Sequence, residues 1–227
     1  MAFIACLLII TWIALDTQHS KQVDAIRFSK EYRCDLTRNN MAHTDSSNDD
    51  EAAVVEVINT LQDIIGTDAG GRGMKSLIVP GDLVDASRVF AKLPITQKSN
   101  NQGALAIAPL VLVVSGFPCC VQHDPPTETD GPPGTMAICK AALALGYRVK
   151  VVTDDCNRVV FQAAVDESHG DLVQLVTFPP EPNMTTDDQA KLKELANEAN
   201  LIVACERAGP GKDGHCYTMR AIDMTAK

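Results

Sequence analysis

The segment from Ser115 to Gly134 (SGFPCCVQHDPPTETDGPPG) carries the densest set of residues that could do chemistry. Glu128 and Asp130 stand just before Gly131-Pro-Pro-Gly134, where the pattern predicts the start of a helix. Backbone N–H groups at a helix start attract anions, so a substrate carboxylate or phosphate could dock at Gly131. The two carboxylates could instead bind a divalent metal through hard oxygen ligands. An Asp N-cap on a proline-stiffened loop is the purely structural alternative.

A second segment, 204–223 (ACERAGPGKDGHCYTMRAID), combines three kinds of polar chemistry. Glu206 and Arg207 directly follow a predicted buried strand, and a loop with several glycines then delivers Asp213, Tyr217 and Arg220. Loops at strand ends often carry functional residues, which favours a site here. A salt-bridged surface loop is the alternative.

The glycine-rich turn at 66–73 (GTDAGGRG) offers Asp68 and Arg72 as possible ligand contacts. It differs from a dinucleotide fingerprint because it follows a predicted helix and its glycines are spaced differently. It differs from a P-loop because no Gly-Lys-Ser/Thr closes it. We therefore expect no nucleotide cofactor, and a flexible turn is the alternative. His123 beside Asp124 is a further acid–base candidate.

Four short runs rich in β-branched residues predict the strands that position these groups. They lie at 110–114, 148–152, 172–176 and 201–205. Helical patterns separate them, which is typical of a parallel sheet with right-handed crossovers. The predicted fold class is α/β, a three-layer Rossmann-like arrangement with a mostly parallel sheet and flanking helices.

The helices are predicted from apolar spacing and from capping signals. The stretch between the first two strands begins with proline and ends at Gly146, which is typical of a buried helix. Residues 157–167 predict a third helix, and Thr186-Asp-Asp-Gln189 predicts a capping box before the last strand. Upstream, Val54, Ile58, Leu61 and Ile65 mark one helical face.

Polar residues at 39–50 (NNMAHTDSSNDD) predict a linker or loop. We therefore divide the chain into residues 1–50, an apolar segment plus linker, and a domain at 51–227. The apolar run Met1–Leu15 is shorter than the ~20 residues that span a membrane. Three interpretations of this run stay open: an uncleaved signal segment, a buried helix and a gene-model artefact. A signal segment would imply secretion or membrane association. This run gives no firm evidence for a membrane.

The amino-acid composition excludes some classes of binding partner. Twenty basic residues against 29 acidic ones give a net charge of −9, so the chain lacks the basic footprint of nucleic-acid binding. Its eight cysteines include no Cys-x-x-Cys pair and no grouping with histidine, which favours reduced thiols over disulfides or zinc. No pattern specifies an oligomeric state.

The topology predicts where the site lies. Ligands of open parallel sheets bind outside the carboxyl ends of the strands, and three of the four ends here carry carboxylates. We therefore expect Glu128, Asp130 and Glu206 to converge at one acidic end of the sheet. Such a site suits a divalent cation or a cationic group of a substrate.

At SGFP…HDPPTETDGPPG and ERAG…DG…Y…MR…D the sequence resembles the C-terminal domain of the D-glutamate cyclase family, from about Glu51 to Asp223. The turn with Asp68 and Arg72 resembles the opening of that domain. The resemblance implies a lyase that converts D-glutamate to 5-oxo-D-proline and water, with a mitochondrial (matrix) location. The family usually has Tyr, Asn and Gly at Cys216, Thr218 and Ala221 and continues past Asp223. We therefore expect a sheet that is incomplete at the C-terminus.

The reaction implied by the resemblance suggests roles for these residues. Glu128 and Asp130 are assigned as bases or metal ligands, Glu206 and Asp213 as further acidic ligands, and the metal as Mn or Mg. Arg207 and Arg220 would clamp substrate carboxylates, and Tyr217 would donate a proton or hydrogen bond. A metal-dependent phosphatase, with phosphate near Gly131, and an inactive truncated ligand-binding fragment are the alternatives.

Overall fold

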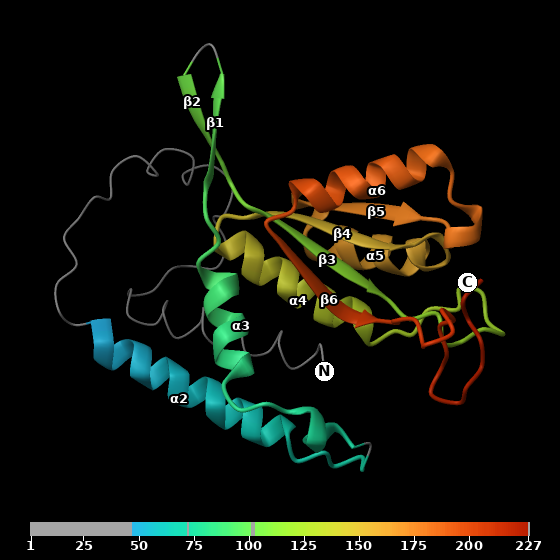
Figure 1. Ribbon diagram of the computed structural model, residues 1–227, viewed down its shortest axis with the longest axis horizontal. Helices are drawn as coiled ribbons and strands as arrows, with labels where there is room; N and C mark the ends of the chain where they lie inside the picture. Colours follow the sequence, from blue (N-terminus) through green and yellow to red (C-terminus); the bar gives the residue numbers. More distant parts are fainter. Residues whose placement is uncertain (1–46, 72, 101–102, 227) are drawn as a thin grey trace. The chain divides into compact units, whose positions relative to one another are not determined.

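The computed structural model describes residues 47–71, 73–100 and 103–226 (Figure 1). The apolar run Met1–Leu15, the part of the predicted linker at 39–46 and Arg72 lie outside these ranges. The chain divides into two compact units, one ending at Asp85 and the other running from Ala86 to Lys227. Each unit is described by itself below.

The unit ending at Asp85 contains helix α2 (Ser47–Ile65) and the short 3-10 helix η1 (Met74–Leu77). The predicted apolar face of α2 is confirmed, because Ile58 is buried and its three partners on that face are half-buried, whereas Ile64 is 60% exposed. Residues 47–50 were predicted as linker, and that is wrong: they form the first turn of α2. Polar residues of this kind are common in a first helical turn, where side-chain oxygens accept from free N–H groups.

The second unit is built on a four-stranded sheet (Figure 1). Its strands are β3 (Leu110–Gly116), β4 (Arg148–Asp154), β5 (Val173–Phe178) and β6 (Leu201–Arg207). They lie in the order β5-β4-β3-β6, and every neighbouring pair is parallel. The four strands predicted from the β-branched runs are therefore confirmed, together with the α/β fold class.

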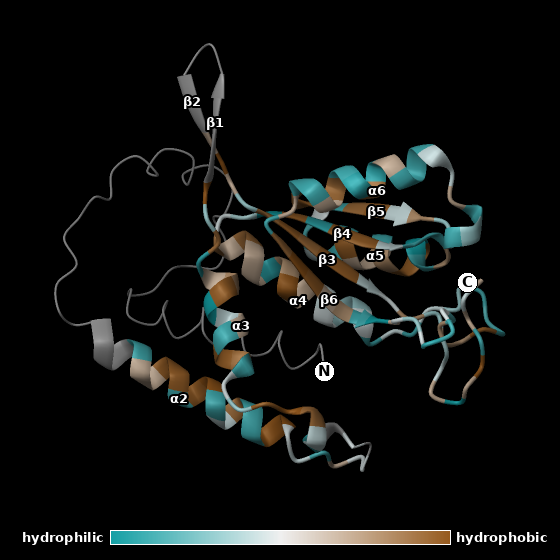
Figure 2. Cartoon of the chain, viewed as in Figure 1, coloured by the Kyte–Doolittle hydropathy of each residue, from teal (hydrophilic) through white to brown (hydrophobic). Residues whose placement is uncertain are grey.

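Helices cover both faces of this sheet. Helices α4 (Gly131–Ala144) and α5 (Arg158–Ser168) pack on one face, and α6 (Thr186–Glu198) packs on the other. The side chains of β3 alternate between the two faces. Leu110 and Leu112 belong to the same core cluster as Leu195 of α6, whereas Val111 and Val113 point to the opposite face and are fully buried. The strands are apolar along most of their length and α6 is mostly hydrophilic (Figure 2).

Three further 3-10 turns, one helix and one β-hairpin complete the fold, and the sequence patterns had missed the helix and the hairpin. The turns are η2 (Asp155–Asn157), η3 (Gly170–Leu172) and η4 (Glu181–Asn183). Helix α3 (Asp82–Ala91) spans the boundary between the units, and strands β1 (Thr96–Asn100) and β2 (Gly103–Ile107) pair antiparallel as a separate hairpin. The hairpin strands are too polar or too rich in small residues to show a clear period of two.

The capping box of α6 begins one residue earlier than predicted. Thr185, not Thr186, is the N-cap: its Oγ1 accepts from the N–H of Asp188 at 3.1 Å, and Asp188 accepts in return from the N–H of Thr185 at 2.9 Å. The prediction required Glu or Gln at the third helical position, but the shorter carboxylate of Asp188 reaches the N-cap equally well. The remaining residues of the predicted box lie inside α6.

Candidate active site

An acidic group lies beyond the carboxyl ends of β3 and β6. One carboxylate oxygen from each of Glu128, Asp130 and Glu206 can be chosen so that all three lie within 4.8 Å of one another. Their predicted convergence is confirmed. Asp213, the fourth predicted acidic ligand, is not part of this group. The group joins the loop before α4 to the end of β6, and Asp130 is its most exposed member.

A β-bulge turns Glu206 toward the other two carboxylates. Ser115 of β3 pairs with Cys205 and Gly116 pairs with Arg207, so Glu206 is the extra residue, with a φ of 48°. Cys205 is buried on the α4 side, with its Sγ 4.0 Å from the carbonyl oxygen of Gly131. In a regular strand the next side chain would point to the opposite face of the sheet. The bulge keeps Glu206 on the α4 side.

Gly131 provides the space that Glu206 occupies. It is the first residue of α4 and is buried, and a Cβ placed on it would lie 2.7 Å from Oε2 of Glu206. Pro132 and Pro133 follow, so two of the first three helical positions have no N–H to offer an anion. Asp130 occupies the N-cap position without making a side-chain capping hydrogen bond. The start of α4 therefore offers carboxylate oxygens and few free N–H groups, which favours binding of a cation over binding of an anion.

Glu128 is held from the opposite side by a thiol. The Sγ of Cys119 donates to Oε2 of Glu128 at 3.3 Å and lies 3.8 Å from the Sγ of Cys120. The N–H of Glu128 also donates to the carbonyl of Phe117 at 3.2 Å. Burial and the hydrogen bond to Glu128 raise the pKa of Cys119 to about 12. Cys119 therefore stays a neutral hydrogen-bond donor that orients the carboxylate.

The environment of Glu206 changes its acidity. Burial, the neighbouring charges of Asp130 and Glu128, and a hydrogen bond with Asp130 raise the pKa of Glu206 from 4.5 to about 7. Carboxylates this close cannot all ionise cheaply, so one of them holds a proton near neutral pH. A carboxyl group that titrates near pH 7 is suited to take up and release protons.

Arg207 does not point its guanidinium at a ligand. Its Nη2 donates to Oδ1 of Asp154 at 2.9 Å and its Nη1 donates to Oδ2 of the same carboxylate. The predicted clamp on substrate carboxylates is therefore occupied by a carboxylate of the protein itself. The sequence could not show this pairing because the partners lie 53 residues apart, at the ends of β4 and β6, which the sheet order leaves unconnected by hydrogen bonds.

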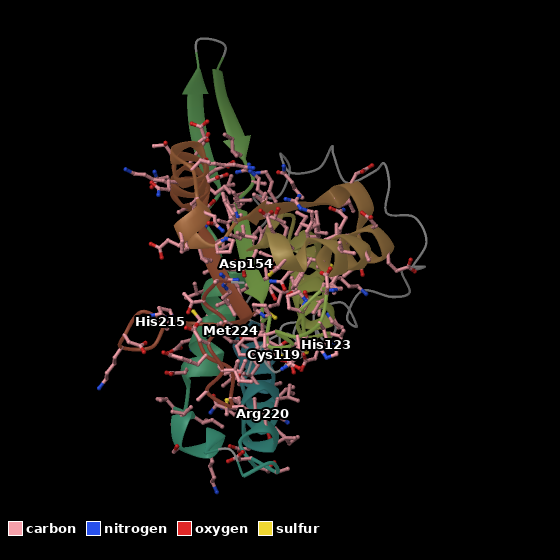
Figure 3. The ribbon with its side chains drawn as sticks, turned by 90° about the vertical axis from the view of Figure 1, so that its right-hand side faces the viewer. Cys119, His123, Asp154, His215, Arg220 and Met224 are labelled. Atoms are coloured by element: carbon pink, nitrogen blue, oxygen red, sulfur yellow. The ribbon has the colours of Figure 1, made fainter. Side chains whose placement is uncertain are left out.

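The segment after β6, which carries His215 and Arg220 (Figure 3), has hydrogen bonds of its own. The hydroxyl of Tyr217 donates to Oδ2 of Asp213 at 2.7 Å, and the N–H of His215 donates to Oδ1 of the same carboxylate at 3.1 Å. These bonds occupy Asp213, which explains its place outside the acidic group. The hydrogen bond to Asp213 raises the pKa of Tyr217. The side chain of Arg220 is exposed.

The remaining candidates lie elsewhere. Asp68 has a φ of 47°, and its Oδ2 accepts from the N–H of Gly73 at 2.8 Å, so it closes the glycine-rich turn within the unit that ends at Asp85. His123 is exposed and is not a member of the acidic group. The sequence patterns assigned no role to three residues near the acidic group: Cys119, which bonds Glu128, Asp154, which bonds Arg207, and Asn157, which bonds Thr127 just before Glu128. The adjacent cysteines were a visible signal, whereas the other two were ordinary polar residues after a strand.

Two observations concern the described part of the chain as a whole. The six cysteines it contains, from Cys119 to Cys216, are all free thiols, as predicted. A search of the same residues for a helix both long and apolar enough to cross a bilayer finds none.

These features define an α/β protein with a candidate acidic active site at the carboxyl ends of a parallel sheet. The sequence model of the D-glutamate cyclase-like C-terminal family matches residues 61–227, and the chain belongs to that family. The mitochondrial D-glutamate cyclase of Homo sapiens is 29% identical over 174 residues, which cover 74% of this chain. The match spans 26% of the human protein's length. No solved structure matches the chain significantly.

Proposed function

We propose that the acidic group converts D-glutamate to 5-oxo-D-proline and water, the reaction that the family resemblance implies. The observation that carries the proposal is the convergence of Glu206, Asp130 and Glu128, whose carboxylate oxygens lie within 4.8 Å of one another. Burial and this crowding raise the pKa of Glu206 to about 7. Family membership supplies the substrate, and the acid–base character of Glu206 supplies a means of moving protons. Glu206 acts as the general acid and base beside Glu128 and Asp130.

The proton balance of the reaction fits one carboxyl group that titrates near neutrality. The ammonium of glutamate loses two protons as nitrogen forms the lactam bond to the side-chain carboxyl carbon. The oxygen that departs from that carbon takes up two protons and leaves as water. Glu206 can carry each proton in turn, accepting it from nitrogen and returning it to oxygen. The negative group also attracts the ammonium and holds it close.

The side-chain carboxylate of the substrate must lose its negative charge to become an electrophile. Three carboxylates would repel it, so a divalent cation is part of the proposal. Ligand oxygens lie ~2.0–2.1 Å from Mg²⁺ and ~2.3–2.6 Å from the larger Ca²⁺, so two oxygens on one ion are at most about 4 Å apart for the first and about 5 Å for the second. The three oxygens, within 4.8 Å of one another, lie near the upper end of that spacing. Glu128 and Asp130 would hold Mn²⁺ or Mg²⁺, and Glu206, predicted as a further ligand, stays beside the ion as the group that exchanges protons. When bound, the ion would neutralise charge on the substrate carboxylate.

The other predicted roles stay proposals. With Arg207 paired to Asp154, Arg220 is the arginine assigned to the substrate's α-carboxylate, and the N–H of Gly131 is a further donor. Tyr217 is bonded to Asp213, so its proposed proton donation requires that hydrogen bond to exchange for one to the substrate. Asp68 and Arg72 are kept as contacts only by the resemblance of their turn. The name of the human relative supports a mitochondrial location.

The test is turnover by the purified chain. D-Glutamate and L-glutamate are each incubated with Mn²⁺ or with EDTA, and 5-oxoproline is separated by chiral chromatography. We expect product from D-glutamate with Mn²⁺, and none from the variant Glu206→Gln, which keeps the size of the side chain but cannot accept a proton. Absence of product from the parent chain would refute the proposal for this chain and favour the alternative of an inactive ligand-binding fragment. Phosphate release from a phosphomonoester in a parallel arm would favour the phosphatase alternative.

A further inference from the structure

Asn157 has an unusual place for a fully buried polar residue. It stands at the N-cap of α5, a position where asparagine ordinarily caps the helix, yet its side chain makes no capping hydrogen bond. Gly116 makes room for it at the end of β3, with a φ of 124°. A Cβ on Gly116 would lie 2.5 Å from Nδ2 of Asn157 and 2.6 Å from Oγ1 of Thr153. The absence of a side chain at Gly116 therefore leaves space for the amide of Asn157, which does not cap α5.

The amide is fully used, in one orientation. Its Oδ1 accepts from Oγ1 of Thr127 at 2.7 Å, and its Nδ2 donates to Oγ1 of Thr153 at 3.2 Å and, at the long distance of 3.5 Å, to Oδ2 of Asp154. A carboxylate can only accept, so the NH₂ end must face Asp154 and the oxygen must face Thr127. The three contacts are compatible only with a side chain that both donates and accepts.

The contacts of the amide lead to both parts of the acidic group. On one side, Thr127 immediately precedes Glu128 in the loop. On the other side, Asp154 holds the guanidinium of Arg207, the residue that follows Glu206 in the bulge. Two chain segments with no direct sequence connection are thus held by one buried side chain.

We infer that Asn157 is a positioning residue that fixes the loop bearing Glu128 against the strand end bearing Glu206. The inference rests on the proposed function for its catalytic consequence, but its geometric content is independent of the substrate. Asn157 does not touch the reacting atoms, since its hydrogen bonds go to Thr127, Thr153 and Asp154. Its effect passes through these neighbours.

The chemistry of the site favours an amide over residues of similar size. Aspartate would place a second carboxylate against Asp154 and would offer no donor to Thr153. Leucine would fill the space but would leave the hydroxyl of Thr127 buried without its acceptor. Residues that hydrogen-bond metal ligands directly typically change metal affinity or activity by roughly 10–100-fold when they are removed. Asn157 acts through one further residue, so the lower end of that range, about tenfold, is expected.

The experiment compares Asn157→Asp, Thr127→Val and Thr127→Ser with the parent chain. Thr127→Val keeps the shape of the side chain and removes the donor to Asn157, whereas Thr127→Ser keeps the donor. Mn²⁺ affinity is measured from the electron paramagnetic resonance signal of the free ion, turnover of D-glutamate from kcat and KM, and folding from thermal unfolding. If Asn157→Asp fails to fold, the two Thr127 variants decide alone.

We expect Thr127→Val and Asn157→Asp to lower Mn²⁺ affinity and kcat by roughly tenfold or more. KM should change less than kcat, and Thr127→Ser should stay within about threefold of the parent. A variant that combines Thr127→Val with Asn157→Asp should have the same Mn²⁺ affinity and kcat as Asn157→Asp alone, because both changes break the same connection. Folded Thr127→Val with parent values of both affinity and kcat would overturn the inference.

A result in which the parent chain neither binds Mn²⁺ nor turns over D-glutamate would refute the proposed function instead. The positioning role is then decided by the backbone amide signals of Glu128 and Glu206 in ¹⁵N–¹H correlation spectra. Changes at both residues in Thr127→Val, and at neither in Thr127→Ser, would support the role. Unchanged signals at both residues in Thr127→Val would overturn it.

Discussion

Replacing Gly131 by alanine separates the stability of the fold from the geometry of the acidic group. The new Cβ would lie 2.7 Å from Oε2 of Glu206, and the next contact, to Cβ of Glu206, is an ordinary 3.5 Å. The obstacle is therefore the end of one flexible side chain and not the backbone. Gly131 is the first residue of α4 and has no positive φ, so alanine fits the local conformation.

The two consequences of Gly131→Ala have opposite signs. Alanine in a helix is favoured over glycine by up to about 1 kcal/mol, so stability should be unchanged or slightly higher. The carboxylate of Glu206 must retreat by about 1 Å to restore normal contact. A displacement of that size at a reacting group can lower the rate by ~10²-fold, equivalent to about 2.7 kcal/mol of lost transition-state stabilisation.

The assay is kcat/KM for D-glutamate together with thermal unfolding by circular dichroism. Gly209→Ala is the matched control, because Gly209 lies three residues beyond Glu206 with nothing within 4 Å of its added Cβ. We expect Gly209→Ala to keep the activity of the parent and Gly131→Ala to lose most of it without a lower melting temperature. Parent-like kcat/KM in Gly131→Ala would refute the reasoning, since Glu206 would then tolerate displacement.

Three further changes test other parts of the site and fold. The carboxyl of Glu206 has its pKa raised from 4.5 to about 7 on folding, so the protein loses stability as pH rises between these values. Glu206→Gln should therefore be about 1 kcal/mol more stable than the parent at pH 8 and equal to it at pH 4 in urea unfolding, after allowance for solvent screening; equal difference at both pH values would contradict this. Asp154→Asn should lower the free energy of unfolding by about 1–3 kcal/mol, because Arg207 loses its charged partner, and an unchanged urea midpoint would show that the pair contributes nothing. Thr185→Ala should lower the free energy of unfolding by about 1 kcal/mol and Thr186→Ala by under ~0.5 kcal/mol. A larger loss of melting temperature in Thr186→Ala would show instead that Thr186 is the N-cap, as predicted from sequence.

The architecture was predictable because short-range patterns and topology agree. The runs of β-branched residues identified all four strands of the parallel sheet, and the helical segments between them required parallel crossovers. Parallel strands bring their carboxyl ends to one edge, so the strand assignment predicted the end of the sheet at which Glu128, Asp130 and Glu206 converge, whereas the β-bulge that turns Glu206 toward the other two was not predicted. Elements without a clear apolar period, such as the β1–β2 hairpin, were missed.

The side-chain pairings of the site were not predictable in the same way. Arg207 and Asp213 were assigned to substrate and metal because of their type and position, but each has a protein partner that satisfies it, Asp154 and Tyr217 respectively. Such partners depend on distances across the sheet and within a loop, which no spacing in the sequence encodes. The role inferred for Asn157 was hidden for the same reason.

Two unfavourable contributions coincide at Glu206, and together they argue for a functional role. A left-handed φ in a non-glycine residue costs ~1–2 kcal/mol, and the raised pKa shows that the ionised carboxyl is disfavoured where it lies. A regular strand would relieve both by pointing Glu206 to the other face of the sheet. Net stability is only ~5–15 kcal/mol for a whole domain, so such a combination is retained where it serves chemistry. The bulge therefore marks Glu206, more than either carboxylate of the loop, as the group whose protonation state the site is built to control.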